Sequence, residues 1–345
     1  MLKGEKIHGY TILEDFKVAG GMSKVSFAGK GGKEYFIKEF LAPKYPTVDS
    51  PGSEKTKAKK REACDQFEKH HKELNNAIAK RCAGTGGNLI YALDFFREGT
   101  SYYKITEKID IAPVSCESIS KLPLGKKMLI VKSAVHSIRI LHGLNIVHGD
   151  LKPDNLPIKE AKKGYIIKLI DFDDSYFESN PPKDKEEIVG TPEYYSPELA
   201  SYIMDEDDEI DGSVLTCKSD IFALGIIFCE YFTGFKPILE KGYSSTWAWV
   251  KDGKDVSFKS GMSKSVESLV RKMLSLSPKD RPSISEVFST LKGFEKDLDK
   301  SISRGPLPSG LIGTMTSVGG RPTPIAPHQE ETEKSTLRGS LLKDI

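Results

Sequence analysis

Short runs of apolar residues mark five segments within the first 110 residues of the chain. These segments, at residues 10–18, 24–29, 34–40, 89–96 and 102–109, are rich in aromatic and β-branched residues and are separated by glycine-containing stretches. Runs of this length and composition, bounded by turn residues, are typical of β-strands. The sequence therefore predicts that strands dominate this part of the chain.

A helical spacing of apolar residues interrupts the strand pattern once. Residues 59–82 carry apolar side chains at positions 63, 67, 74 and 78, and glycines from position 84 onward end the periodic segment. Residues 43–60, which mix Pro, Ser, Gly and Lys, predict a loop or an insertion. His70 and His71 are expected at the surface of the helix, because no further metal-ligating residues lie near them in the sequence.

Helical spacing prevails beyond residue 110. Residues 126–144 place apolar side chains in a largely helical rhythm, and residues 219–233 and 264–274 are further helical candidates. A strand-rich smaller lobe followed by a helix-rich larger lobe is an α+β layout. The sequence therefore predicts a bilobal fold whose boundary lies near residues 110–115.

The last part of the chain, residues 293–345, is rich in Ser, Thr, Pro, Gly and charged residues and shows little periodicity. Such a segment buries too little apolar surface to offset the entropy lost on ordering. We expect a flexible tail there, and its hydroxyls at Thr314, Thr316, Ser317 and Thr323 are candidate autophosphorylation sites.

Composition narrows the classes of partner. The chain has 51 basic and 49 acidic residues among 345, a formal net charge of +2, which gives no support for nucleic acid or a membrane surface as partner. The N-terminus lacks an apolar signal segment, and the longest apolar run, at residues 221–232, is too short to span a bilayer. The five cysteines are scattered without a CxxC pair, so reduced thiols and a cytoplasmic location are expected.

The residues with the clearest chemistry lie in the middle of the chain. Residues 148–155 read His-Gly-Asp-Leu-Lys-Pro-Asp-Asn, and Ile-Asp-Phe follows at 170–172. Phosphoryl transfer from a magnesium nucleotide needs a base, a cation for the transferred phosphate and oxygen ligands for the metal, and these two segments hold that set. Here the chain resembles the eukaryotic-type Ser/Thr protein kinases.

The resemblance implies a role for each polar residue of these two segments. Asp150 corresponds to the catalytic aspartate that accepts or orients the proton of the substrate hydroxyl. Lys152 would neutralise charge on the γ-phosphate, and a lysine at this place implies a serine or threonine acceptor. Asn155 and Asp171 would hold Mg²⁺ through oxygen ligands.

A glycine-containing turn near the N-terminus resembles the loop that covers the nucleotide phosphates in kinases. The family's first and third glycines are Val18 and Ser23 here, whereas Gly20 and Gly21 remain and Val25 follows. The sequence GGMS in this turn is similar to that of bacterial Ser/Thr kinases. These five residues are the expected phosphate-covering part of an ATP site.

The resemblance also predicts an ion pair with Lys38, which ends the strand sequence Tyr-Phe-Ile-Lys. A lysine in such an apolar strand needs a partner, because an unpaired buried charge is costly. In the family this lysine meets the α- and β-phosphates and a helix glutamate. Glu73 is the preferred candidate for that glutamate, and Glu68 is the alternative.

The segment that would contact adenine follows the second strand pair. Thr106 aligns with the family's gatekeeper position, and the backbone groups of Glu107 and Ile109 are then expected to hydrogen-bond adenine.

Two positions depart from the protein kinase pattern. Gly149 replaces the arginine of His-Arg-Asp, which in the family gathers a phosphorylated activation loop. We therefore expect activity that does not depend on phosphorylation at Ser175, Ser179 or Thr191. Asp173 replaces the glycine of Asp-Phe-Gly, which restricts the backbone and adds negative charge beside the metal site.

Both departures are ordinary in small-molecule kinases of the aminoglycoside and choline phosphotransferase type, which therefore form an alternative. Three later segments favour a protein substrate: residues 190–198, 219–225 and 277–283 resemble ordered motifs of protein kinases. In that family a glutamate and an arginine from the first and last of these segments form a buried salt bridge, here Glu198 with Arg281. A pseudokinase scaffold is a further alternative, against which the retained Lys38, Asp150, Asn155 and Asp171 argue.

The resemblance thus implies a protein kinase domain at residues 9–292, with an N-lobe at about 9–110 and a C-lobe at about 111–292. It implies ATP and Mg²⁺ as the cofactors and Ser/Thr-containing proteins, including the chain itself, as substrates. Neither nucleic acid nor a membrane is expected as a partner.

Overall fold

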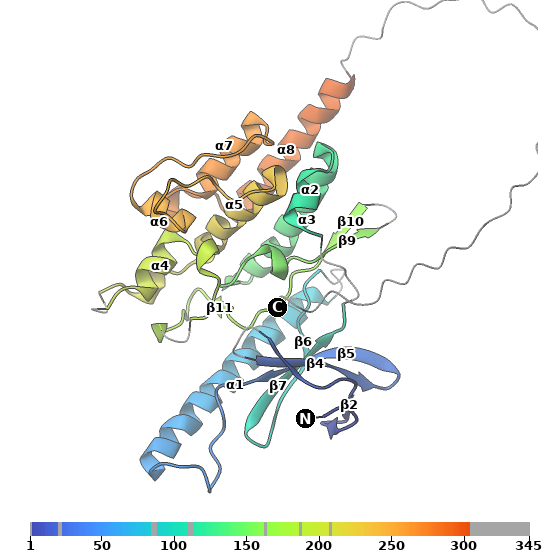
Figure 1. Cartoon of the computed structure of the whole chain (residues 1–345), viewed down its shortest axis with the longest axis vertical. Helices are drawn as coiled ribbons and strands as arrows, with labels where there is room; N and C mark the ends of the chain where they lie inside the picture. The colour runs from blue at the N-terminus through green and yellow to red at the C-terminus, as the bar shows by residue number, and fades with distance from the viewer. Residues whose placement is uncertain are drawn as a thin grey trace, which may run out of the picture. The chain divides into compact units, whose positions relative to one another are not determined.

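The computed structural model describes residues 2–19, 23–83, 88–109, 114–161, 164–185, 188–206 and 209–303, and among these the side chains of 160–164 and 295–303 are left out of the description. The chain divides into two units, Met1–Asp297 and Leu298–Ile345. The first unit holds every helix and strand that positions the site, and it is shown in Figure 1.

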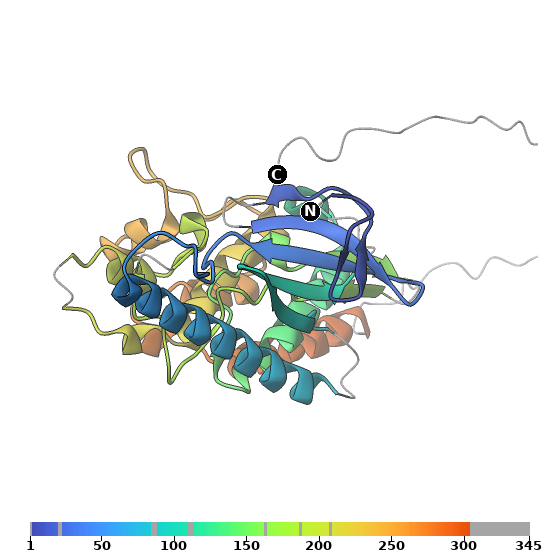
Figure 2. The ribbon, with the colours of Figure 1, turned by 90° about the horizontal axis from the view of Figure 1, so that it is seen from below.

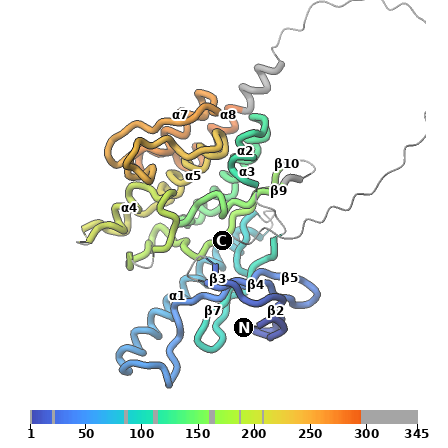
Figure 3. The backbone as a smooth tube through the Cα atoms, in the orientation of Figure 1, coloured from blue at the N-terminus to red at the C-terminus, as the bar shows by residue number. Residues whose placement is uncertain are grey.

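The first lobe contains one antiparallel sheet, in which the strands run in the order β1-β2-β4-β5-β7-β6 and β3 pairs with β4. Figure 3 traces the backbone of this lobe and labels β2, β3, β4, β5 and β7. Apolar side chains that alternate along the strands, such as Ile12, Ala28, Ile37 and Ile105, form its core. The strands are β1 Lys6–Ile7, β2 Tyr10–Ile12, β3 Lys17–Ala19, β4 Ser23–Lys30, β5 Lys33–Phe40, β6 Ala92–Glu98 and β7 Ser101–Glu107. The strand-rich first lobe predicted from the sequence is confirmed.

Helix α1, Glu54–Cys82, lies alongside this sheet (Figures 1 and 2). It begins within the segment that the sequence predicted to be a loop, because Ser53 caps it by accepting a hydrogen bond from the Thr56 amide and the lysines that follow are good helix formers. Phe67 and His71 of α1 pack against Phe40 and Phe95 of the sheet. His71 is therefore buried, and its predicted surface position is wrong.

The second lobe is mainly helical and is built around α5, Cys217–Thr233, in which fifteen residues from Ser219 to Thr233 are buried. The remaining helices are α2 Cys116–Ser120, α3 Leu124–His142, α4 Pro197–Ile203, α6 Thr246–Lys251, α7 Lys264–Met273 and α8 Ile284–Ser303. Short strands β8 Ile146–Val147, β9 Ile158–Ala161, β10 Gly164–Ile167 and β11 Tyr176–Phe177 join them, together with the 3₁₀ turns η1 Pro153–Asn155, η3 Pro192–Tyr194, η4 Gly212–Val214 and η5 Pro278–Asp280. The predicted α+β, two-lobed fold is confirmed.

Two observations concern the lengths of the helices. Helix α8 continues to Ser303, so residues 293–303 are helical where the sequence predicted an aperiodic tail. Within the described part of the chain, no helix is both long enough and apolar enough to traverse a lipid bilayer.

Candidate functional site

The segment that carries Asp150 is held in place by Asp220, a buried carboxylate of α5. Asp220 accepts hydrogen bonds from the His148 amide at 2.8 Å and from the Gly149 amide at 3.3 Å, and the His142 ring lies 2.8 Å away. A buried carboxylate needs such partners, because burial without hydrogen bonds is costly. The second lobe thereby fixes the backbone immediately before Asp150.

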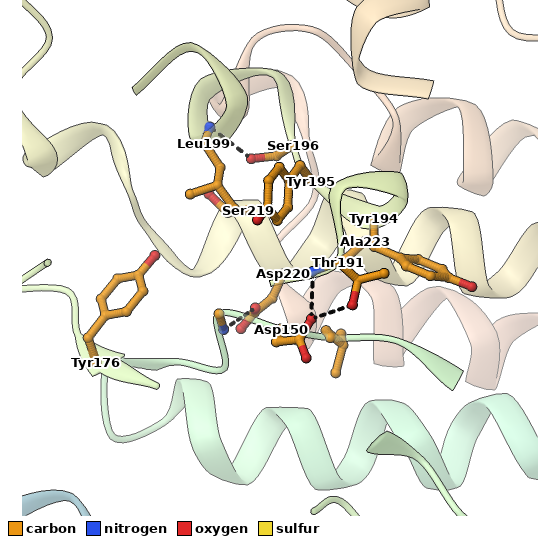
Figure 4. A pocket seen from close by; sticks show the side chains of 12 residues that line it. Asp150, Tyr176, Thr191, Tyr194, Tyr195, Ser196, Leu199, Ser219, Asp220 and Ala223 are labelled. Atoms are coloured by element: carbon orange, nitrogen blue, oxygen red, sulfur yellow. Dashed lines mark hydrogen bonds between the residues drawn. The ribbon is translucent and has the colours of Figure 1, made fainter. Parts of the chain in front are cut away.

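Asp150 forms a compact polar cluster with three other side chains. Figure 4 shows its contacts with one of them, Thr191. One carboxylate oxygen accepts from both the amide and the hydroxyl of Thr191, each at 3.0 Å. The other accepts from Lys152 at 2.7 Å, and the Asn155 amide nitrogen donates to the Asp150 carbonyl at 2.7 Å. Lys152 also donates to the Thr191 hydroxyl at 2.9 Å. The structure therefore brings Asp150, Lys152 and Asn155 together as predicted and adds Thr191.

Gly149 adopts a backbone conformation that only glycine accommodates here. Its φ is +85°, and a Cβ at this position would lie 2.2 Å from the carbonyl oxygen of Asp174. Any larger side chain would both strain the backbone and collide with a main-chain atom. The missing arginine of the His-Arg-Asp pattern is therefore incompatible with this loop geometry.

The second carboxylate, Asp171, is presented by a strained backbone with φ of +60°. On one side of it, the His148 ring bonds the Ile170 carbonyl at 3.0 Å. On the other, Phe172 is buried and packs near the His148 ring, and the Ser175 hydroxyl donates to the His148 carbonyl at 2.9 Å. These contacts tie the segment of Asp171 to the segment of Asp150.

Two lysines of the sheet and two aspartates of this segment form a four-charge cluster. Lys38 lies 2.6 Å from a carboxylate oxygen of Asp173 and 3.3 Å from one of Asp171. Lys104 lies 3.3 Å from the same Asp171 oxygen and forms an ion pair with the other oxygen of Asp173. The cluster contains two positive and two negative charges, so its net charge is zero.

The protonation states in and around this cluster follow from burial and from the neighbouring charges. Burial lowers the pKa of Lys38, but Asp173 and Asp171 outweigh it, so that its pKa lies above the ordinary value. Burial raises the pKa of Asp173, but Lys104 and Lys38 hold it well below the ordinary value. For Asp174, burial and the nearby carboxylates of Asp173 and Asp171 raise the pKa to about 7.

The predicted pairing of Glu73 with Lys38 is wrong. The side chain of Glu73 is 57% exposed, and its nearest cation is Lys69 at 3.9 Å. The alternative, Glu68, pairs with Lys72 instead. Both glutamates lie outside the set of buried α1 residues, which are Lys57, Cys64, His71, Leu74, Ile78 and Cys82.

The expected phosphate-covering residues lie on the β3–β4 hairpin. Val18 of β3 is 62% exposed, and the side chain of Ser23 at the start of β4 is buried, where its hydroxyl donates to the Ala19 carbonyl at 3.1 Å. Val25 pairs in register with Lys17. Gly20 and Gly21, which lie between β3 and β4 in the sequence, are outside the described residues.

The expected adenine-contacting residues lie at the end of β7. Thr106 is buried within the strand, Glu107 is its exposed last residue, and Ile109 follows at an intermediate exposure. Glu107 pairs in register with Tyr35 of β5, the strand that carries Lys38. Glu107, a predicted adenine contact, and Lys38, a predicted phosphate contact, therefore lie on adjacent strands, β7 and β5.

The donor atoms near Asp150 fit a magnesium ion. Asn155 donates from its amide nitrogen to the Asp150 carbonyl, and its amide oxygen is a hard donor. Asp171 has carboxylate oxygens, one of which lies 3.3 Å from both Lys38 and Lys104. Mg²⁺ prefers such hard oxygen ligands and usually takes one or two from a protein and the rest from water and phosphate.

The predicted salt bridge between Glu198 and Arg281 is confirmed. Arg281 is almost completely buried and donates to both carboxylate oxygens of Glu198, at 2.7 Å each. The remaining guanidinium bonds reach the carbonyls of Ser275, Lys218 and Leu276. This bidentate pair fixes the end of the segment that begins at Asp171.

Sequence reasoning missed Lys104 and Thr191 as members of the site. Lys104 lies in a buried run, Tyr-Tyr-Lys-Ile-Thr at residues 102–106, and the argument made for Lys38 applies equally to it. The motif at residues 190–198 predicts Thr191 only as a candidate phosphorylation site, whereas the structure bonds its hydroxyl to Asp150 and Lys152.

Comparison with known proteins adds independent findings. The protein kinase domain family matches residues 53–291. This region contains Asp150, Lys152, Asn155 and Asp171, and it begins after Lys38.

Several curated proteins are similar to this chain over part of its length. Aurora kinase of Saccharomyces cerevisiae is 32% identical over 44% of the chain and 37% of its own length. The serine/threonine-protein kinase pkn3 of Myxococcus xanthus is 26% identical over 62% of the chain and 39% of its own length. The human liver/testis phosphorylase b kinase gamma catalytic chain is 26% identical over 56% of the chain and 44% of its own length. The chain thus spans less than half the length of each of these three relatives.

Proposed function

We propose that this chain, which belongs to the protein kinase family, transfers the γ-phosphoryl group of ATP to serine and threonine hydroxyls of proteins. The observation that carries the proposal is the cluster of Asp150, Lys152, Asn155 and Thr191, joined by hydrogen bonds of 2.7–3.3 Å. It combines a carboxylate base, a cation and a metal-ligating amide in one place.

Each side chain of the cluster has its own proposed role in the reaction. The acceptor hydroxyl oxygen forms a bond to the γ-phosphorus while the bond from that phosphorus to the β–γ bridging oxygen breaks, and ADP leaves with the electron pair. The carboxylate of Asp150 takes the hydroxyl proton. Lys152 neutralises charge on the transferred group, and Lys38 holds the α- and β-phosphates.

Mg²⁺ is the proposed metal, because Asn155 and Asp171 supply hard oxygen ligands. When bound, it neutralises phosphate charge that would otherwise repel the attacking oxygen. Asp171 is available for this role only after its contacts of 3.3 Å with Lys38 and Lys104 loosen. Backbone groups of Glu107 and Ile109 hold adenine, and Val18, Gly20, Gly21, Ser23 and Val25 cover the phosphates.

A protein acceptor is favoured over a small molecule by the segment that ends at the Glu198–Arg281 pair. Small-molecule kinases do not need the platform that this segment forms in protein kinases. All the curated relatives named above carry kinase names, and pkn3 is named a serine/threonine-protein kinase. The chain's own tail, with Thr314, Thr316, Ser317 and Thr323, is included among the substrates.

The proposed domain covers residues 9–292, because strands β2 to β5 complete the sheet that β6 and β7 continue. Residues 293–345 form the proposed tail. None of the five cysteines, all of which lie in the described part of the chain, forms a disulfide bond, which supports action in the reducing cytoplasm.

An acceptor panel tests the proposed substrate class. The purified chain is incubated with γ-labelled ATP and Mg²⁺ together with serine, threonine and tyrosine peptide libraries, aminoglycosides, choline and sugars. We expect label on serine and threonine peptides and on the chain itself. Transfer to a small molecule alone would contradict the proposal, and no transfer to any acceptor would favour the scaffold alternative.

A further inference from the structure

Two lysines stand directly opposite each other on neighbouring strands of the sheet. Lys38 of β5 and Lys104 of β7 are partners in the antiparallel register, so their side chains leave the same face. Their side chains are only 16% and 10% exposed. Like charges at opposed positions destabilise a sheet, and more so when water is excluded. The pair therefore requires an anion between the two ammonium groups.

Asp173 is that anion. Its side chain is 12% exposed, one carboxylate oxygen lies 2.6 Å from Lys38, and the other pairs with Lys104. Asp171 also contacts both lysines, but at 3.3 Å and with a side chain that is 38% exposed. Asp171 is the proposed metal ligand, so its carboxylate is needed elsewhere during the reaction. Asp173 remains as the carboxylate that can stay on Lys38.

Helix α1 offers no competing anion. Four residues of α1 line a pocket with Lys104 and Asp173, and none of them is acidic: His71, Leu74, Asn75 and Ile78. Burial, together with Lys104, His70 and Lys38, lowers the pKa of His71 to about 3 despite the opposing effect of Asp173. The His71 ring is therefore uncharged. Glu68 and Glu73 pair with Lys72 and Lys69 on the outer side of the helix.

We propose that Asp173, anchored by Lys104, takes the place of the helix glutamate and is the residue that orients Lys38 toward the nucleotide phosphates. Asp173 and Lys104 are thus positioning residues that act through Lys38. The carboxylate that replaces the glycine and the lysine in the middle of β7 balance each other's charge. The inference rests on the proposed function, because it assumes that Lys38 contacts phosphate.

The direction in which ADP affinity changes distinguishes two roles of Asp173: holding Lys38 in position, or only balancing its charge. Removing the negative charge of Asp173 makes the cluster more positive, and by charge alone the affinity for ADP would rise. Loss of an oriented Lys38 lowers it instead. The double variant Asp173→Asn/Lys104→Met removes one charge of each sign and keeps the net charge at zero, so any loss of affinity in it comes from positioning.

The test is calorimetric binding of ADP and of adenosine, without metal, to the wild type, Asp173→Asn, Asp173→Gly and the double variant. We expect ADP to bind about tenfold more weakly to all three variants, as for loss of one charge-assisted contact. Adenosine, which has no phosphate, should bind equally to all of them. Glu68→Gln and Glu73→Gln serve as matched carboxylate controls and should bind both ligands as the wild type does.

Several results would overturn the inference. One is ADP affinity in Asp173→Asn or the double variant that equals or exceeds that of the wild type. Another is an equal loss of ADP and adenosine affinity, which would mean that the substitutions disturb the structure of the first lobe in general and not the position of Lys38. A third is loss of ADP affinity in Glu68→Gln or Glu73→Gln with unchanged affinity in the Asp173 variants. If the wild type binds no ADP at all, the proposed function fails first and this inference with it.

Discussion

The Cα of Gly149 lies so close to the main chain of Asp174 that a Cβ on it would lie 2.2 Å from the Asp174 carbonyl oxygen. This approach joins the segment of Asp150 to the segment of Asp171, and it does so at the position where protein kinases commonly carry an arginine. At this position the chain therefore has a close backbone contact in place of a side chain that could bind a phosphate group. The backbone before Asp150 is held by this main-chain contact and by Asp220, which accepts hydrogen bonds from the His148 and Gly149 amides.

The first prediction concerns this contact. Gly149→Ala should destabilise the chain by about 2–5 kcal/mol, the sum of a left-handed backbone penalty and a steric overlap. The control is Gly125→Ala at the start of α3, where a Cβ meets nothing within 4 Å. Urea unfolding of both variants measures the difference. Equal stability of the two variants would mean that the loop accommodates a side chain by another route.

A second prediction concerns the Thr191 hydroxyl, which donates to Asp150 and accepts from Lys152. Thr191→Val should lower kcat by about ten- to hundredfold, the effect expected when a hydrogen bond to a charged group is lost. Thr191→Ser keeps the hydroxyl and should retain most of the activity. Steady-state kinetics with a peptide acceptor measures both variants. A fully active Thr191→Val would exclude this residue from the site.

A third prediction concerns the buried Glu198–Arg281 pair. Glu198→Gln leaves the Arg281 guanidinium buried without its counter-charge and should cost about 3–5 kcal/mol of stability. Glu267→Gln, in the exposed pair with Arg271 on α7, should change stability by less than about 1 kcal/mol. Denaturant titration of the two variants provides the comparison. Similar small changes in both would show that the buried pair is energetically unimportant.

A fourth prediction concerns pH and His71, whose pKa in the folded chain is about 3 because of burial. In the unfolded chain an ordinary histidine has a pKa of about 6.5, so the unfolded state binds more protons between these two values. The free energy of unfolding should therefore fall as the pH is lowered below about 6.5. His71 should account for about 2 kcal/mol of this loss at pH 5.

His71→Leu tests this contribution, because it keeps a buried apolar side chain but has no group that takes up the proton. Its loss of stability between pH 6.5 and pH 5 should be smaller than that of the wild type by about 2 kcal/mol. His8→Gln, which alters a more exposed histidine of the first lobe, serves as the control and should follow the wild-type curve. An unchanged slope in His71→Leu would mean that His71 is charged in the folded chain.

The sequence was sufficient where the chemistry lies in short contiguous motifs. Asp150, Lys152 and Asn155 fall on one turn, so their local spacing already predicted that they meet, and the structure joins them by hydrogen bonds. The Glu198–Arg281 bridge was predicted across a long separation, because both ends lie in recognisable motifs. The α+β, two-lobed layout followed from the change of apolar periodicity along the chain.

The sequence was insufficient where tertiary packing decides which residue faces the site. The rotation of α1 about its axis is set by Phe67 and His71, which pack against the sheet, and this turns Glu73 outward. A search for an acidic partner of Lys38 on the helix could not reveal this. The partner of Lys38 is Asp173. Lys104 also pairs with Asp173 and supplies the positive charge that offsets a second carboxylate beside Asp171.

The central claim is that Asp150 serves as the base in phosphoryl transfer, and a single-turnover assay of Asp150→Asn with γ-labelled ATP and Mg²⁺ tests it most directly. The variant keeps the size of the side chain and still accepts a hydrogen bond from Thr191, so ATP should bind with near wild-type affinity. The account predicts a transfer rate about 10²–10⁴-fold lower than that of the wild type. Transfer by Asp150→Asn at the wild-type rate would contradict it.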